Sequence, residues 1–408
     1  GDWGRDEREV KEPRTPEPGS VILTGAEKEA SEGRNFVPEH FYRPARQKGT
    51  LRRVRYLTKN YASDGKTREK DAVVYLPYGY DRATDETRCN VLYLLHGSGG
   101  SEISYMGSEE EPQRLKHMAD HMIEEGLIEP MIFVMPTYVY SREELEQARA
   151  TALTFYKELI NDLIPAVEGQ FRTYAADLTA EGIRRSRGHR AFGGFSLGSV
   201  AAWEVFARAM DTAKYYLTLC GDCWAYEPFG GREHPAWAAE YLSRMAKKSG
   251  YGLRDYFIFT ATGTEDSAYE MLPPMVAELR KHPDAFVCGG KNYESGNLVY
   301  YLAEGYKHSY GYTCEYIYNA LQLFFRQERA DEERTKAPGG ECAEGRRGGD
   351  LRNRPDDPVK KQKAGEIISL AFFRPFFPPG RPAWSNFCNY SGFCSMSVFS
   401  TSAADGIS

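Results

Sequence analysis

The sequence predicts an α/β fold with a mostly parallel central sheet and helices on both faces. Apolar segments at 90–95, 131–135 and 215–220 show no polar alternation, which is typical of strands buried on both faces. Segments with helical apolar spacing lie between them, so strand and helix alternate along the chain. Glycine-rich or polar turns follow several of these strands, where folds of this class place ligand sites.

The predicted elements begin at Leu51. Residues 51–57 alternate in polarity, and a turn at 63–66 separates them from a strand at 70–77, which predicts an antiparallel hairpin. The remaining strands are expected at 90–95, 131–135, 191–193, 215–220, 255–261 and 297–302. Apolar residues spaced three or four apart predict helices at 112–126, within 143–171, and at 199–210, 235–249, 269–281 and 312–325.

The two ends of the chain differ from this central part. Residues 1–48 are charged and rich in proline and glycine, which predicts an extended or disordered leader. Residues 49–327 carry the alternating pattern and are expected to form one domain. Residues 328–408 show no clear helix or strand period, and prolines interrupt their apolar part. We expect a low-order tail there, with non-native sequence as one hypothesis for its origin.

Composition argues against several classes of function. The 408 residues have a formal net charge of −6 and no basic cluster, so no nucleic-acid partner is expected. No apolar run approaches the length of a membrane span, and the chain starts without methionine or a signal peptide. The eight cysteines are irregularly spaced, and Cys220-Gly-Asp-Cys223 lacks the second pair of a zinc site. We expect neither a disulfide scaffold nor a metal.

The segment Gly194-Phe195-Ser196-Leu197-Gly198 has the pattern G-x-S-x-G. This pattern is typical of a nucleophile elbow, a strained turn from strand to helix with a serine at its tip. Small flanking residues are needed because strand and helix approach closely there. An apolar strand precedes the motif and a helix follows it, which favours an elbow over an ordinary Gly/Ser turn.

A serine nucleophile needs a base, and the base needs an acid that orients it. His308 directly follows the last predicted strand, where a loop can reach Ser196, so it is the candidate base. Asp266 and Asp222 both follow strands that end at the same edge of the sheet. We favour Asp266 as the acid over Asp222, the alternative acid, and over Glu265.

The tetrahedral intermediate of such a reaction needs an oxyanion hole. The backbone N–H of Leu197, directly after the nucleophile, is one candidate donor. The second is expected from the loop His96-Gly97-Ser98-Gly99-Gly100, with the N–H of Ser98 as the candidate. His96 is interpreted as a residue that braces this turn by hydrogen bonds.

Five segments occur in order: NVLYLLHGSGG, HRAFGGFSLGS, LCGDCW, ATGTED and GYKHSYGYTCEYIYNALQLFF. Together they resemble the feruloyl esterase and acetyl xylan esterase branch of carbohydrate esterase family one, the esterase D-like group of the α/β-hydrolases. The resemblance covers roughly residues 50–327 and implies an α/β-hydrolase fold. The chain departs from the pattern in its tail and at Ser199, where many hydrolases carry another glycine.

The resemblance implies a triad of Ser196, Asp266 and His308 that performs a two-step acyl transfer without metal or cofactor. It also implies a secreted enzyme, often part of a multidomain xylanase, with feruloylated or acetylated xylan and its oligosaccharides as substrates. The expected activity is release of ferulic acid. An acetyl xylan esterase or other small-acyl esterase is the alternative, and a non-catalytic carbohydrate-binding module is a weaker one. The candidates for stacking on a phenolic ring, with ordinary packing as the alternative, are Trp224, Tyr105 and Met106.

Overall fold

The computed structural model describes residues 23–84, 86–138, 144–290 and 295–326. Within them, eight strands form one sheet in the order β1-β2-β4-β3-β5-β6-β7-β8. The strands are β1 (Thr50–Lys59), β2 (Thr67–Leu76), β3 (Asn90–Leu95), β4 (Met131–Met135), β5 (Arg190–Phe195), β6 (Tyr215–Leu219), β7 (Phe257–Glu265) and β8 (Leu298–Lys307). Strand β2 pairs antiparallel with β1 and β4, and all other pairs are parallel. The predicted mostly parallel sheet and the antiparallel hairpin are confirmed, and the structure places the hairpin at one edge of the sheet.

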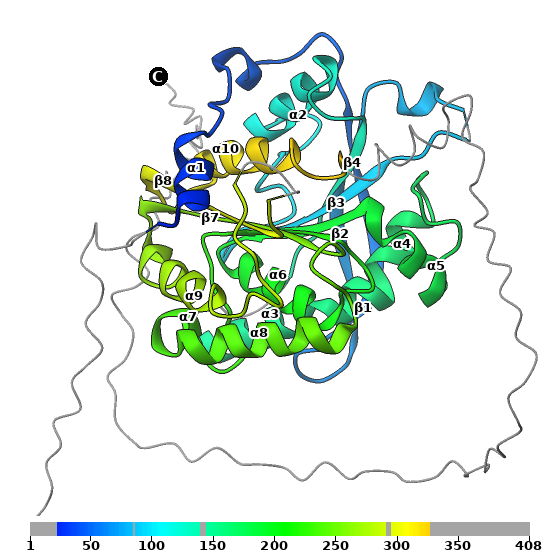
Figure 1. Cartoon of the computed structure of the whole chain (residues 1–408). Helices are drawn as coiled ribbons and strands as arrows, with labels where there is room; N and C mark the ends of the chain where they lie inside the picture. Colours follow the sequence, from blue (N-terminus) through cyan, green and yellow to red (C-terminus); the bar gives the residue numbers. More distant parts are fainter. Residues whose placement is uncertain (1–22, 85, 139–143, 291–294, 327–408) are drawn as a thin grey trace, which may run out of the picture. The chain divides into compact units, whose positions relative to one another are not determined.

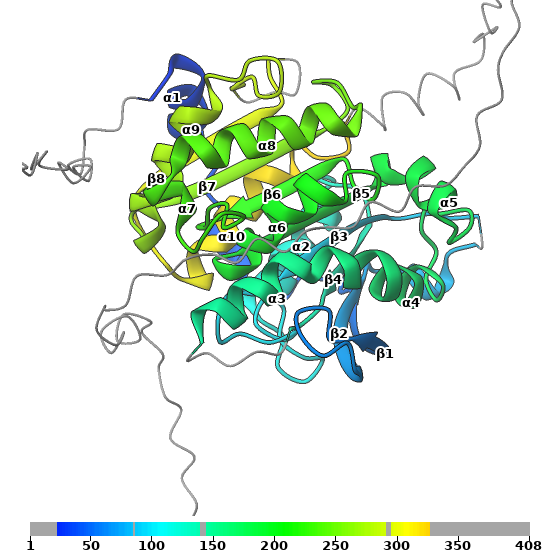
Figure 2. The same ribbon diagram turned by 90° about the horizontal axis from the view of Figure 1, so that it is seen from below.

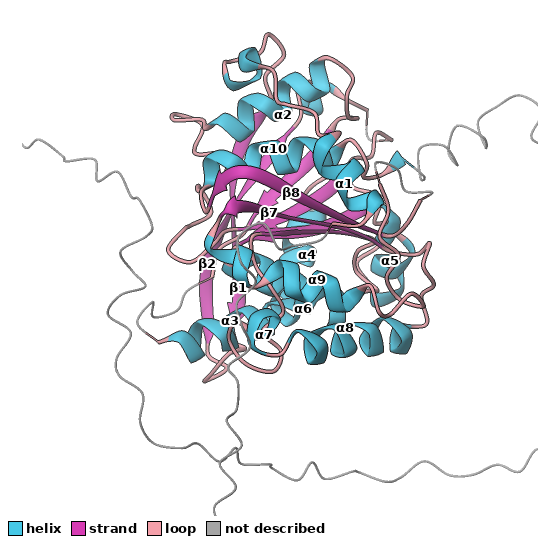
Figure 3. Cartoon of the chain, turned by 60° about the vertical axis from the view of Figure 1, so that its left-hand side comes forward, coloured by secondary structure: helices cyan, strands magenta, loops and turns pink. Residues whose placement is uncertain are grey.

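Helices cover both faces of this sheet. Figure 3 shows α2 and α10 over one face and α3, α6 and α8 over the other, and Figure 2 shows the last three side by side. The helices are α1 (Gly25–Glu32), α2 (Arg114–Glu124), α3 (Leu145–Glu158), α4 (Ile164–Glu168), α5 (Ala180–Arg185), α6 (Leu197–Arg208), α7 (Gly230–Glu233), α8 (Pro235–Ser249), α9 (Leu272–Leu279) and α10 (Tyr310–Leu321). A π-helical turn at Leu159–Leu163 joins α3 to α4. Among the described helices, none combines the length and the apolar character needed to cross a bilayer.

Strand β3 shows why its sequence lacks polar alternation. All six of its residues are buried, and successive side chains point to opposite faces. Val91, Tyr93 and Leu95 belong to the core cluster on one face, whereas Leu92 and Leu94 belong to the cluster on the other. Each position therefore meets an apolar layer, which is the environment that favours a continuous apolar run.

Strands β7 and β8 extend further than expected. The sequence predicts strand ends at 261 and 302, but β7 runs to Glu265 and β8 to Lys307. The extensions pair with each other across a register shift between Gly263 and Glu265. The glycines and polar residues of these extensions are typical of turns in the sequence. Their pairing depends on the partner strand, which the local sequence does not show.

The prediction of an extended or disordered leader is wrong for residues 23–48. Thr24 and Glu27 form a capping box that starts α1, and the Glu27 carboxylate is buried against Arg280. Helix α1 lies beside β8 (Figure 1), where the Ser31 hydroxyl accepts a hydrogen bond from the backbone N–H of Leu302. Phe41 is fully buried. These long-range contacts order a charged segment whose own composition gives no such signal. Residues 1–22 and the predicted tail at 328–408 lie outside the described residues.

A buried ion pair anchors the start of β5. Arg190 donates from Nε and Nη2 to the two carboxylate oxygens of Glu168 at 2.6 and 2.8 Å, and both side chains are at most 2% exposed. The hydroxyls of Tyr93 and Thr173 donate to the same carboxylate. Burial alone would raise the pKa of Glu168, but the charge of Arg190 and these hydrogen bonds hold it below its usual range.

Replacement of Glu168 by alanine should therefore destabilise the fold strongly. Glu168→Ala leaves the Arg190 guanidinium buried without its counter-charge, and we expect a loss of about 3–5 kcal/mol in the free energy of unfolding. Urea denaturation measures this loss. The control is Glu181→Ala, which breaks an exposed pair with Arg184 on α5 and should change stability little. Equal stability losses in the two variants would contradict the structural role of the buried pair.

Candidate active site

Ser196 occupies the sharp turn between β5 and α6. Its backbone has φ 56° and ψ −118°, a positive φ that a non-glycine residue rarely adopts. The Ser196 N–H donates to the Leu219 carbonyl on neighbouring strand β6 at 2.8 Å, which holds the turn against the sheet. The predicted strand–serine–helix geometry is therefore present, with the strain that is typical of functional turns.

The two glycines of the motif are required by backbone contacts. A Cβ added at Gly194 would lie 2.7 Å from the Cα of Gly198. One added at Gly198 would lie 2.7 Å from the carbonyl oxygen of His96 and clash with that of Leu95. Helix α6 thus starts in direct backbone contact with β5 and with the end of β3, and only glycine allows that approach.

The side chains of Ser196, His308 and Asp266 form one hydrogen-bonded line. His308 Nε2 lies 2.8 Å from Ser196 Oγ, and His308 Nδ1 lies 2.8 Å from Asp266 Oδ1. Since an ionised carboxylate only accepts, Nδ1 carries the proton and Nε2 accepts from the serine hydroxyl. The Asp266 side chain is fully buried, whereas that of His308 is 30% exposed, so the line runs from the interior to the surface.

The three residues come from the carboxyl ends of three parallel strands, β5, β7 and β8. Asp266 directly follows β7, and its Oδ1 also accepts from the backbone N–H of Ala268 at 2.7 Å. This second hydrogen bond fixes the carboxylate toward His308. The ring of Phe195 lies 4.5 Å, centroid to centroid, from the ring of His308 and limits its movement from the other side.

Asp222, the alternative acid, is engaged elsewhere. Its Oδ1 accepts from Trp224 Nε1 at 2.8 Å, and its Oδ2 accepts from the backbone N–H of Gly231 at 2.6 Å. Burial raises the pKa of Asp222 above its usual range, and the two hydrogen bonds oppose that rise. Asp222 thus holds the loop after β6, while Glu265 faces solvent beside Lys307.

The predicted oxyanion loop lies against the serine. A Cβ added at Gly97 would be 3.1 Å from Ser196 Cβ, so this loop and the elbow are in contact. The Gly97 N–H donates to the Tyr310 hydroxyl at 2.8 Å. His96 braces the loop as expected, with Nδ1 2.8 Å from the Gly97 carbonyl oxygen and Nε2 2.7 Å from Thr137 Oγ1. Ser98 lies at the surface of the same loop.

Leu197 is the other expected oxyanion donor and is the first residue of α6. Backbone N–H groups in the first turn of a helix have no carbonyl partner within that helix. Its position directly after Ser196 is the one that the elbow motif predicts. The assignment of Leu197 and Ser98 as donors to an oxyanion stays a prediction.

The predicted phenolic contacts are not supported at Tyr105 and Met106. Tyr105 is 4% exposed, donates its hydroxyl to the Leu95 carbonyl and packs edge-on against Tyr310, and Met106 is fully buried. Trp224 is 7% exposed and is held by Asp222 and by an edge contact with Phe229. The sequence places these residues near strand ends but does not show which way the side chains turn, and here they turn into the core.

Two residues around this hydrogen-bonded line were not assigned to the site from the sequence. Tyr310 contacts Phe195 and accepts from Gly97, and its place two residues after His308 was the available signal. Cys220 follows β6 with φ 54°, and its Sγ lies within 4.8 Å of the ligand atoms of Asp266 and His308. Burial raises the pKa of the Cys220 thiol well above its usual range, so this side chain is a neutral neighbour of the acid.

Residues 63–321 match the family model described as "Putative esterase". The chain belongs to this esterase family. Together with the eight-stranded sheet and its elbow, the match identifies the described part of the esterase as an α/β-hydrolase fold, as the sequence predicts.

Known relatives of the esterase include two curated proteins and a solved module. It is 33% identical over 291 residues to endo-1,4-beta-xylanase Y of Acetivibrio thermocellus, covering 71% of this chain and 24% of that protein. It is 30% identical over 185 residues to an endo-1,4-beta-xylanase/feruloyl esterase of Xylanibacter ruminicola, covering 44% of this chain and 23% of that protein. The chain therefore spans about a quarter of each curated relative.

The solved module is the feruloyl esterase module from Clostridium thermocellum, as a serine-to-alanine mutant complexed with sinapinate. It is 33% identical, with a TM-score of 0.62, covering 72% of this chain and 94% of that one. The similarity thus extends over nearly the whole of a single esterase module.

Replacement of Gly198 by alanine should damage both stability and the site. The new methyl group would clash with two backbone carbonyls that cannot rotate away. We therefore expect the free energy of unfolding to fall by about 1–3 kcal/mol and Ser196 to be displaced. Gly25→Ala is the control, because a Cβ at Gly25 meets nothing within 4 Å. Denaturation curves and hydrolysis of 4-nitrophenyl acetate measure the two effects. A Gly198→Ala variant as stable and active as Gly25→Ala would contradict the tight elbow.

Proposed function

We propose that this chain is a feruloyl esterase that releases ferulic or related hydroxycinnamic acids from plant xylan through an acyl-enzyme. The observation that carries the proposal is the hydrogen-bonded line from Ser196 through His308 to Asp266. The substrate class is supported by the solved feruloyl esterase module, which holds sinapinate, and by two curated relatives named as xylanases.

In the first half of the reaction, Ser196 Oγ attacks the ester carbonyl carbon while its proton moves to His308 Nε2. Asp266 accepts the Nδ1–H and stabilises the imidazolium that results. The N–H groups of Leu197 and Ser98 are the proposed donors to the negative oxygen of the tetrahedral intermediate. When this intermediate collapses, the ester C–O bond breaks, and the proton passes from Nε2 to the departing sugar hydroxyl.

In the second half, water replaces the sugar next to His308. His308 Nε2 takes a proton from the water as its oxygen attacks the acyl-serine carbonyl. Collapse of the second intermediate returns the proton to Ser196 Oγ and frees the carboxylic acid. The His308 side chain is 30% exposed, which suits this exchange of sugar for water.

The setting of the enzyme is also part of the proposal. The similarity to modules of long xylanases supports a place in a multidomain xylanase that acts on xylan outside the cell. A small-acyl esterase, such as an acetyl xylan esterase, remains the alternative because the same catalytic line serves any ester. A binding module without catalysis is disfavoured by the aligned serine, histidine and aspartate.

The nucleophile is tested by Ser196→Ala. Removal of Oγ removes the atom that forms the acyl-enzyme, so kcat on methyl ferulate should fall by about 10⁴–10⁶ while the fold persists. Initial rates and circular dichroism measure the two properties. Substantial activity in a folded Ser196→Ala protein would exclude this mechanism.

The acid is tested by a matched pair of variants. Asp266→Asn cannot hold the Nδ1–H tautomer of His308, and kcat should fall by about 10⁴. Asp222→Asn alters a buried loop anchor away from His308 and should lower kcat far less, even if it lowers stability. The two variants are compared by their kcat on methyl ferulate, calculated per folded molecule. A larger loss of kcat in Asp222→Asn would reverse the assignment.

The substrate class is tested by comparing feruloylated and acetylated xylo-oligosaccharides as substrates of the wild-type chain. Release of ferulate with the higher kcat/KM supports the proposal. Release of acetate alone would make the chain a small-acyl esterase, and no serine-dependent release from either would favour the binding module.

A further inference from the structure

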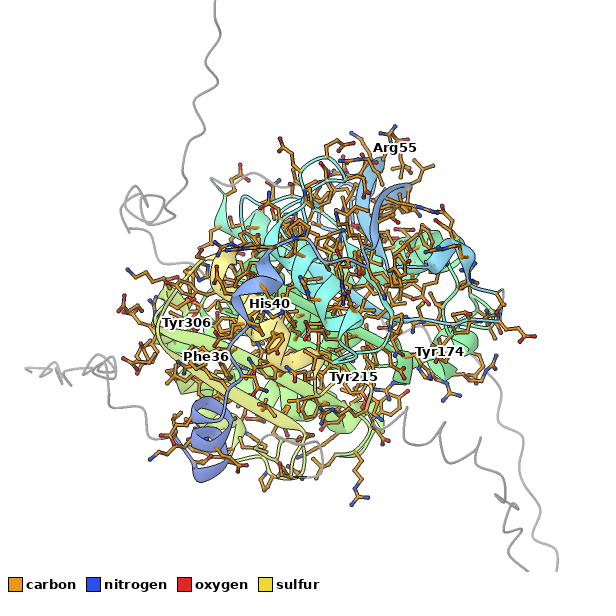
Figure 4. The ribbon with its side chains drawn as sticks, turned by 90° about the horizontal axis from the view of Figure 1, so that it is seen from above. Phe36, His40, Arg55, Tyr174, Tyr215 and Tyr306 are labelled. Carbon is orange, nitrogen blue, oxygen red and sulfur yellow. The ribbon has the colours of Figure 1, made fainter. Side chains whose placement is uncertain are left out.

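Three possible metal ligands converge where the N-terminal segment crosses helix α2, outside the catalytic line. His40 lies in the 3₁₀ turn Glu39–Tyr42, while His121 and Glu125 lie one turn apart at the C-terminal end of α2. One ligand atom from each of the three residues lies within 4.8 Å of the other two. Figure 4 shows His40 on the N-terminal segment beside α2.

We propose that His40, His121 and Glu125 form a binding site for a divalent transition-metal ion, with Zn²⁺ as its simplest occupant. Two imidazoles and one carboxylate are a ligand set that Zn²⁺ takes in proteins, with a fourth position left for water. The His40 and Glu125 side chains are 62% and 45% exposed, so an ion and its water can reach the site from solvent.

The spacing of the ligand atoms suits a tetrahedral ion. Bond lengths of about 2.0–2.2 Å place neighbouring ligand atoms roughly 3.3–3.5 Å apart in that geometry. Glu125 Oε1 lies 3.2 Å from His40 Nε2 and 3.8 Å from His121 Nδ1. The ligand atoms of His40 and His121 lie within 4.8 Å of each other, and the exposed side chains of His40 and Glu125 leave room for adjustment around an ion.

The orientation of His121 supports the proposal independently. Its Nε2 lies 3.1 Å from the carbonyl oxygen of Arg43, which only accepts, so Nε2 carries the proton. The lone pair is thereby left on Nδ1, the atom that faces Glu125. The ring also stacks on Phe41, with centroids 4.9 Å apart and planes at 12°, and Phe41 is fully buried. A carbonyl that fixes the second ring nitrogen is the usual support of a metal-binding histidine.

His40 and Glu125 also form an exposed ion pair, and a second such pair in this chain lacks the third ligand. His234 and Glu227 approach to 2.7 Å and are similarly exposed, but they belong to none of the three-ligand groups found among the described residues. This pair therefore provides a matched control. Because His40 and Glu125 lie on different elements, a bound ion would fasten the N-terminal segment to α2, so binding and stability should change together.

The test is isothermal titration of the full chain with ZnCl₂, comparing wild type with His40→Gln, Glu125→Gln and His234→Gln. Loss of one ligand should weaken Zn²⁺ binding at this site by at least about tenfold. Loss of a residue that only supports a ligand already lowers metal affinity by about 10–100-fold. His234→Gln should titrate like wild type. All four proteins share the cysteine thiols and the possible ligand group at His308, so Zn²⁺ binding there should be the same in each. A difference between the titrations therefore reports on the site at His40.

Two further measurements locate the bound ion and test whether it stabilises the fold. Crystals soaked in ZnCl₂ should show an anomalous peak bonded to His121 Nδ1. Zn²⁺ should raise the thermal midpoint of wild type and His234→Gln but not of His40→Gln. Identical titrations of wild type and His40→Gln, or soaked crystals without that peak, would overturn the proposal. Neither readout depends on ester hydrolysis, so the result stands apart from the proposed esterase function.

Discussion

Ser196 keeps its positive φ because α6 begins immediately beside β5 and β3, where two glycines let the backbones touch. Gly194 removes the side chain that would meet the first turn of the helix, and Gly198 removes the one that would meet the end of β3. The resulting turn directs the serine hydroxyl toward His308, and Leu197 follows it as the first residue of α6. Any relaxation of this turn would move the nucleophile and a proposed oxyanion donor together, which is why the rest of the site depends on it.

Parallel strands bring the other candidate catalytic groups, His308 and Asp266, to that point. The carboxyl ends of β5, β7 and β8 share one edge of the sheet, so residues distant in sequence meet there. The extended pairing of β7 with β8, including its register shift, sets Asp266 and His308 at 2.8 Å. Around them, Tyr310 holds the loop at Gly97 and Ala268 holds the Asp266 carboxylate through hydrogen bonds. The three side chains are thus held at the ends of strands of one sheet.

A second set of contacts joins the ends of the fold to its centre. The buried pair of Glu168 and Arg190 fixes the start of the strand that ends at Ser196. Glu27 buries its carboxylate against Arg280, and Phe41 fills a core position below α2. The N-terminal segment is therefore part of the domain from residue 23 onward. The proposed metal site at His40 would add one more attachment of this segment to α2.

The sequence by itself determined the fold class, the positions of the strands and the elbow, because burial on both faces and backbone contact at glycines restrict local residue types directly. It also predicted Ser196 and His308 as candidates, since a motif and a strand end constrain both, and the structure brings these two side chains together. Only the tertiary structure shows that Asp266, which the sequence favours, reaches His308 while Asp222 bonds to Trp224 and Gly231, because both follow strands that end at the same edge and sequence does not give side-chain direction. The same reason explains why Tyr105 turned out to be a core residue. The order of residues 23–48 also required the fold, since the partners of Glu27 and Phe41 lie far away in the chain.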